Sequence, residues 1–163
     1  MRRATPHSRQ IRAFTIVEIV IVLVILGILA AAGIPRYANS LASYRVQQAA
    51  ARVMADLTLA QVSARTTSVS RTITFSTATS SYSMASVQNG TPTTNVSSTP
   101  QEHTVNLSAD PYHATLVSAS FGGTSQVTFD RYGQPSSGGT VVIQVGAFQR
   151  TITLDANSGK ASQ

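Results

Sequence analysis

The chain has 163 residues with 12 basic side chains, 6 acidic side chains and no cysteine. This length allows one domain plus a long helix, and the lack of cysteine excludes disulfide stapling and thiolate chemistry. Four of the basic residues lie within residues 1–13, so the rest of the chain carries 8 basic against 6 acidic residues, a net charge of +2. The overall charge therefore gives little support to a nucleic-acid-binding surface.

An apolar run begins at Phe14 and ends at Ile34, and it contains one charged residue, Glu18. Its 21 residues are long enough to cross a bilayer as a helix. The preceding basic segment predicts that the N-terminal end stays on the cytoplasmic side. A secretory signal cleaved near Ala30–Gly33 is an alternative, but signal peptides have a shorter apolar core. We therefore expect a single membrane-spanning helix.

Glu18 lies inside the apolar run, where a carboxylate is costly in lipid. One interpretation is structural, because Thr15 and Glu18 have the spacing of a capping box and a carboxylate favours the positive end of a helix dipole. The other interpretation is functional, because a cap at the water interface does not require a carboxylate within an apolar run.

The basic leader, the small residue Ala13 and the segment from Phe14 to Glu18 resemble the N-terminus of type IV pilins and type II secretion pseudopilins. In that family a prepilin peptidase cuts before the Phe and methylates the new N-terminus, which implies processing between Ala13 and Phe14. The family usually has Gly before the cut, where this chain has Ala13. The resemblance also implies that Glu18 neutralises the Phe14 amine of a neighbouring subunit and sets the register between subunits.

The same resemblance implies the partners and the location. The partners would be other pilin or pseudopilin subunits, the prepilin peptidase and the inner membrane, with no cofactor and no small-molecule substrate. The globular domain would lie outside the cytoplasm before the subunit enters a filament. The implied domains are a leader at 1–13 that is removed, an apolar helix at 14–37 and an α+β globular domain at 38–163.

The helical pattern continues beyond the apolar run. Pro35 predicts a kink, since proline removes one helical hydrogen bond. Apolar residues then recur at steps of three or four, which predicts a single buried stripe: Val46, Ala50, Val53, Leu57, Ala60 and Ala64. Polar residues, including Asp56 and Gln61, are assigned to the other faces. We therefore expect one helix from Phe14 to about Arg65, whose second half packs on a sheet.

From Thr66 onward the chain is rich in Ser, Thr and Val. Alternating patterns predict strands at 69–75, 82–87, 103–107, 113–119, 126–129, 140–145 and 148–154. Gly146-Ala147 reads as a hairpin turn, Asp110-Pro111 as a turn, and residues 88–100 as a loop. The expected fold class is α+β, a pilin-like fold with a long N-terminal helix on an antiparallel sheet.

The C-terminal part resembles, more specifically, the minor pseudopilin H and FimT-type group. The resembling segments are Phe129–Gly133, Val141–Val145, Arg150–Leu154 and Ser158–Lys160. Some FimT-like minor pilins bind DNA through a C-terminal Gly-Arg-x-Arg element, and the matching place here, Gly159–Ser162, keeps one basic residue. Arg131 and Arg150 could join Lys160 in a weak patch, but three charges give only salt-sensitive phosphate contact, and no row of aromatic residues is present.

No catalytic or metal-binding constellation is visible in the sequence. His103 and His113 flank the predicted turn, but two histidines alone make a weak metal site and surface positions are favoured. Asp155–Gly159 is similar to the start of a calcium loop, but the later bidentate acid is missing, so a plain Asx turn is favoured. We expect a structural, non-enzymatic subunit, with a DNA-binding minor pilin and a single-span anchored β domain as the alternatives.

Overall fold

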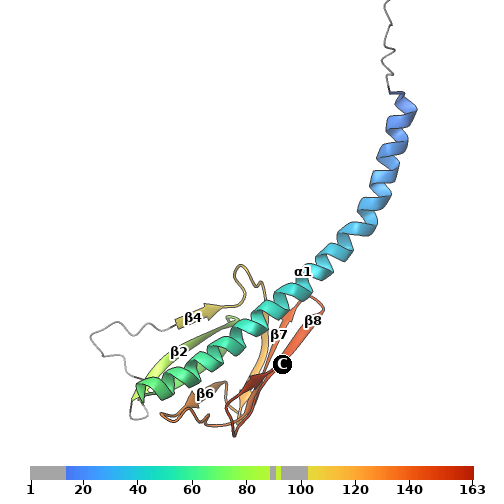
Figure 1. Ribbon diagram of the computed structural model, residues 1–163. Helices are drawn as coiled ribbons and strands as arrows, with labels where there is room; N and C mark the ends of the chain where they lie inside the picture. Colours follow the sequence, from blue (N-terminus) through green and yellow to red (C-terminus); the bar gives the residue numbers. More distant parts are fainter. Residues whose placement is uncertain (1–13, 89–90, 93–102) are drawn as a thin grey trace, which may run out of the picture. The chain divides into compact units, whose positions relative to one another are not determined.

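The computed structural model describes residues 14–88, 91–92 and 103–163 (Figure 1). The predicted leader and most of the predicted loop at 88–100 lie outside the described residues. The chain divides into two compact units between Asn39 and Ser40. We call the described part of the first the N-terminal unit and Ser40–Gln163 the globular unit. The predicted division at 37/38 stays a prediction.

Helix α1 comprises Ile16–Thr67, close to the predicted range. Helical backbone continues through Pro35, and the predicted kink there stays a prediction. In the globular unit the predicted stripe is confirmed, since all six of its members are at most 1% exposed. The helix ends where Ser68 adopts a left-handed backbone with φ of 53°, which allows the chain to turn into the first strand.

The strands form two antiparallel sheets, where the sequence predicted one. Sheet A contains β1 (Ser70–Ser76), β2 (Ser81–Gln88), β3 (Thr91–Pro92), β4 (His103–Asn106) and β6 (Gln126–Phe129). Its order is β3-β2-β1-β6, and β4 also pairs with β2. Sheet B contains β5 (Thr115–Phe121), β7 (Gly139–Val145), β8 (Phe148–Leu154) and β9 (Ala161–Ser162), in the order β5-β7-β8-β9.

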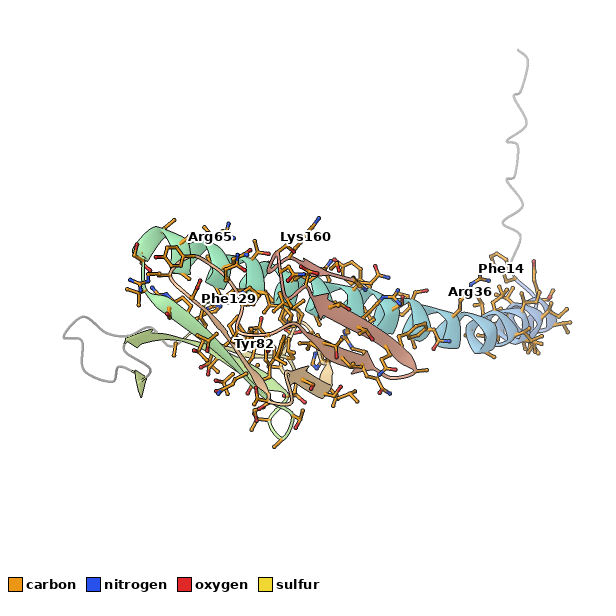
Figure 2. All side chains as sticks on the ribbon, turned by 90° about the horizontal axis from the view of Figure 1, so that it is seen from below. Phe14, Arg36, Arg65, Tyr82, Phe129 and Lys160 are labelled. Carbon is orange, nitrogen blue, oxygen red and sulfur yellow. The ribbon has the colours of Figure 1, made fainter. Side chains whose placement is uncertain are left out.

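The two sheets share one apolar core with the globular part of α1. Phe75 of β1 contacts Tyr82 of β2 and Phe121 of β5, with ring centroids 5.4 Å and 5.5 Å apart. Figure 2 shows Tyr82 and Phe129 on the side of the sheets that faces the helix. Because Phe121 belongs to sheet B, this aromatic group joins both sheets beneath the helix.

Several further sequence-based assignments require correction. The predicted loop at 88–100 includes Thr91–Pro92, which pairs with β2 as β3, and the two-residue strand β9 was not predicted. Asp56 and Gln61, assigned to the outer faces of the helix, are buried at 4% and 9% exposure. They are buried because distant segments of the chain, described below, supply hydrogen-bond partners beside the apolar stripe.

Candidate functional site

The N-terminal unit presents an apolar surface all around its helix. Each large apolar side chain from Phe14 to Leu29 is between 49% and 83% exposed. By length and composition, α1 is apolar enough here to cross a membrane. A helix that is apolar on every face needs lipid or other apolar helices around it.

The start of this helix is capped by Thr15. The backbone N–H of Glu18 donates a 3.2 Å hydrogen bond to Thr15 Oγ1, and Ile19 N donates to the Thr15 carbonyl at 3.3 Å. The N-cap at Thr15 is thus confirmed. The cap uses the backbone of Glu18 and the hydroxyl of Thr15, so the exposed Glu18 carboxylate is not needed for that bond.

The structure describes only one of the two residues that form the predicted processing bond. Ala13 lies outside the described residues, and Phe14 precedes the first helical turn with 76% of its surface exposed. The roles of Ala13, Phe14 and Glu18 stay predictions.

A buried polar cluster connects α1 to sheet A. Asp56 Oδ2 accepts a hydrogen bond from Tyr82 Oη at 2.6 Å and another from Arg52 Nε at 2.9 Å. Arg52 Nη2 lies 2.8 Å from His103 Nε2, which is 3.7 Å from the same Asp56 oxygen. The bond to Asp56 raises the pKa of Arg52, and burial followed by the Asp56 bond raises the pKa of Tyr82 far above its ordinary value.

Gln61 joins α1 to two loops that are far apart in sequence. Its Nε2 donates to the Gly133 carbonyl at 3.0 Å and to the Ser158 carbonyl at 2.9 Å. One turn further along the helix, Arg65 Nε donates to the Tyr132 carbonyl at 2.9 Å. The loops after β6 and after β8 are therefore both held against the same stretch of the helix.

Side chains of α1 approach the backbone of both loops closely at two glycines. Gly133 has φ of 75° and Gly159 has φ of 65°. A Cβ atom at Gly133 would overlap the Arg65 side chain, and one at Gly159 would overlap the Gln61 amide. Glycine tolerates both the left-handed backbone and the missing space.

The three cations of the predicted DNA patch occupy two regions of the globular unit. Arg131 and Lys160 are exposed and lie on the two loops that Gln61 holds, and the Arg131 guanidinium is 5.5 Å from the Tyr132 ring centroid. Arg150 lies on β8, in a groove with Gln47 and Gln163. Gln47 and Gln61 are 14 positions apart on one helix, about 21 Å at 1.5 Å per residue. A single patch of all three cations is therefore not favoured by this geometry, and DNA contact stays a prediction.

The histidines and the C-terminal acidic turn have separate local partners. His103 contacts Arg52, whereas His113 Nε2 lies 3.4 Å from Asp110 Oδ1. Asp155 Oδ1 accepts hydrogen bonds from Asn157 N, Ser158 N and Ser158 Oγ, which confirms the predicted Asx turn. These hydrogen bonds hold the pKa of Asp155 below its ordinary value, and the bond from Ser158 N has the largest effect. Within the described parts of the chain, no three His, Asp or Glu side chains are grouped as metal ligands.

Comparison with known protein families identifies the family of this chain. Residues 49–159 match the family model of the type II transport protein GspH. The chain belongs to the GspH family. Residues 8–34 match the prokaryotic N-terminal methylation motif, which spans the predicted processing bond and the whole apolar run. This GspH family member is therefore a pilin-like protein, and such proteins are structural subunits.

Solved structures support the fold. Two crystal forms of the type IV minor pilin FimU from Pseudomonas aeruginosa are similar to this GspH family member, at TM-scores of 0.51 and 0.50. The first is 16% identical and covers 72% of this chain and 86% of FimU, and the second is 17% identical and covers 71% and 90%. This likeness confirms the predicted pilin-like α+β fold. No curated protein sequence matches the chain.

Gln61 and Asp56 are the residues that sequence reasoning missed at this site. The segments Phe129–Gly133 and Ser158–Lys160 were recognised as similar to the minor pseudopilin group, but without a physical reason. The structure supplies one, since Gly133 and Ser158 are the acceptors of the Gln61 amide. A polar residue beside an apolar helical stripe was the signal available in the sequence.

Proposed function

We propose that the protein is a minor subunit of a type II secretion pseudopilus or a type IV pilus. It would be anchored in the inner membrane by the apolar part of α1, with the globular unit outside the cytoplasm. After cleavage between Ala13 and Phe14, it would enter the filament through that same helix. Membership of the GspH family and the methylation motif support this proposal.

One observation carries the proposal further than the family alone. The apolar part of the helix exposes apolar side chains on every face and has a single carboxylate, Glu18, four positions after Phe14. Cleavage before Phe14 creates a positive α-amino group near that carboxylate. In an apolar filament core, an amine from one subunit needs a partner of opposite charge, and Glu18 of a neighbour provides one.

Processing is the first test of this function. Intact-mass analysis of membrane-extracted protein should show a chain that begins at Phe14 with a methylated nitrogen. Ala13→Gly should be processed at least as fast as the parent, whereas Ala13→Leu should accumulate as precursor because a bulky side chain does not fit a subsite made for Gly or Ala. A mature chain that begins at Met1, or one cut after Ala32, would contradict the proposal.

The two alternatives give different outcomes. A single-span membrane protein with a β domain would not be cut by a prepilin peptidase. A DNA-binding minor pilin would be cut and would also retard DNA in a low-salt gel shift, with the retardation lost as salt rises. In that case the loss in Arg131→Gln and Lys160→Gln should exceed the loss in Arg150→Gln, because Arg150 lies in the other region.

A further inference from the structure

Strand β8 has an edge that is open for most of its length. It pairs with β7 from Phe148 to Leu154, but with β9 only at Thr153 and Leu154. Among the described residues, no strand pairs with the other side of Phe148–Ile152. Unpaired backbone groups on such an edge are a template for a further strand.

The pairing register identifies the backbone groups on this edge. Asp155 N donates to the Lys160 carbonyl at 3.0 Å, in line with the pairing of Thr153 with Ser162. Since hydrogen-bonded pairs alternate along an antiparallel ladder, the next N–H and C=O groups that point outward belong to Thr151 and Gln149. The Gln149 carbonyl accepts one long hydrogen bond of 3.4 Å from Arg150 Nη1.

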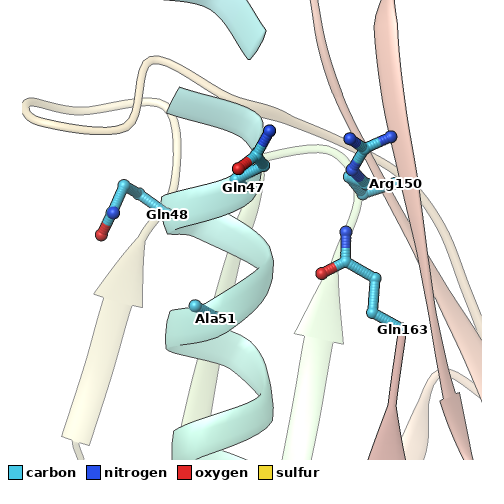
Figure 3. Close-up of a pocket in the computed structure, with 5 residues that line it drawn as sticks. All are labelled: Gln47, Gln48, Ala51, Arg150 and Gln163. Carbon is cyan, nitrogen blue, oxygen red and sulfur yellow. The ribbon is translucent and has the colours of Figure 1, made fainter. Parts of the chain in front are cut away.

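A polar surface groove lies beside this edge (Figure 3). The residues that line it are Gln47, Gln48, Ala51, Arg150 and Gln163. In Figure 3 the side chains of Gln47 and Gln163 lie near Arg150, in the space between α1 and β8. Amide side chains can donate to and accept from a peptide backbone, and a guanidinium favours a carboxylate.

Arg150 supplies a positive charge to this groove. Among the described residues that line it there is no acidic side chain, and the described hydrogen bonding of the Arg150 guanidinium is limited to the long contact with Gln149. A partly buried arginine with so weak a partner is available to a carboxylate from outside. The open edge of β8 therefore favours an extended peptide backbone as the ligand, and the Arg150 charge favours a ligand with a carboxylate side chain.

We propose that this groove binds an extended segment of another protein chain, which adds to β8 as a strand and places a carboxylate against Arg150. Main-chain bonds to Gln149 and Thr151 supply affinity, and the ion pair supplies selectivity, as in other cases of strand addition. The bound segment replaces the Arg150–Gln149 contact. This surface lies in the globular unit and does not involve Glu18 or the apolar helix, so it is independent of the proposed function.

The test uses the full chain in detergent micelles and a fluorescent, end-capped heptapeptide of alternating Thr and Val with one central Glu. Fluorescence anisotropy should show saturable binding. Replacing the peptide Glu by Gln, or introducing Arg150→Gln, should each weaken binding about tenfold or more, as expected for a hydrogen-bonded charge pair. The two changes combined should weaken it little further, because each removes the same contact.

Two variants at Thr151 test the strand-addition geometry separately. Thr151→Pro removes an N–H that no described strand uses, so the fold should tolerate it at an edge while peptide binding is lost. Thr151→Val keeps the backbone N–H and should bind like the parent. Circular dichroism checks that both variants are folded.

The inference is overturned if the peptide shows no saturable binding, or if Arg150→Gln binds it as well as the parent does. Arg150 would then only protect the edge of β8 from unwanted pairing. Either result would leave the processing and assembly of the subunit unaffected.

Discussion

Tyr82 Oη donates a 2.6 Å hydrogen bond to Asp56 Oδ2, and this bond joins strand β2 to a buried carboxylate of helix α1. Asp56 is 4% exposed and Tyr82 is 2% exposed. The same oxygen accepts from Arg52, so the carboxylate is both neutralised and hydrogen-bonded. Removing one partner of such a buried charge is strongly destabilising, because the group that remains is left without compensation.

Asp56→Ala should therefore destabilise the globular unit. The loss strands the Tyr82 hydroxyl in the core, while Arg52, which is 38% exposed, can turn toward water. We expect the free energy of unfolding to fall by about 2–3 kcal/mol. Urea denaturation measures this change, and Thr58→Ala on the exposed side of the same helix is the control, expected within about 0.5 kcal/mol of the parent. Equal stability of the two variants would show that the cluster contributes nothing.

Tyr82 should also give the protein an alkaline limit. Its pKa lies well above the ordinary value of 10 in the folded state, so the folded chain holds this proton more tightly than the unfolded chain does. Its contribution to stability is complete below about pH 10 and is lost as the pH rises above that value. In Tyr82→Phe the fall in stability above pH 10 should be shallower than in the parent. Parallel stability curves for the two proteins would contradict this assignment.

Gly133 and Gly146 form a matched pair for testing the clamp between α1 and the loops. Both have positive φ, of 75° and 58°, but a Cβ at Gly146 meets nothing within 4 Å. Gly146→Ala should cost about 1 kcal/mol for the backbone alone. Gly133→Ala should cost about 2 kcal/mol, because it also displaces Arg65 from the Tyr132 carbonyl. In an Arg65→Ala background this excess should disappear, and its persistence would place the cause elsewhere.

Local patterns were sufficient for most of the elements and insufficient for their polar connections. The apolar stripe from Val46 to Ala64 predicted the buried face of α1, and the alternation at 148–154 predicted β8 with its hairpin turn, because period and turn chemistry are local properties. Asp56 and Gln61 were misplaced because their partners, Tyr82 and the loops at Gly133 and Ser158, are 26 to 97 positions away. The division into two sheets likewise depends on pairing that is non-local in sequence.

In the candidate site, too, features that depend on neighbouring residues could be predicted and those that depend on distant segments could not. The Thr15 cap could be predicted, because the capping hydroxyl and the backbone N–H that donates to it are three residues apart. The separation of Arg150 from Arg131 and Lys160 could not, because it depends on where β8 and the two loops meet the helix. The open edge of β8 also has no local signature in the sequence, because it depends on which distant segments pair with β8.

The globular unit should fold without the apolar helix. A fragment Ser40–Gln163 retains all the buried residues of the core and should be soluble and monomeric, with a mixed helix and strand signal in circular dichroism. Val53→Asp should unfold it, because Val53 is 1% exposed and an unpaired charge at that position has no partner in the core. An aggregated parent fragment would contradict the division into two units.

The Glu18 carboxylate is the most direct test of assembly through the apolar helix. Because the chain has no cysteine, a single introduced cysteine such as Val20→Cys gives one defined site for crosslinking between subunits in cells. Glu18→Gln keeps the backbone N–H that donates to Thr15 Oγ1, so the helix cap remains intact and processing before Phe14 should be normal. With processed protein at equal abundance, we predict that crosslinking into filaments falls to background in Glu18→Gln, whereas normal crosslinking of this variant would contradict the account.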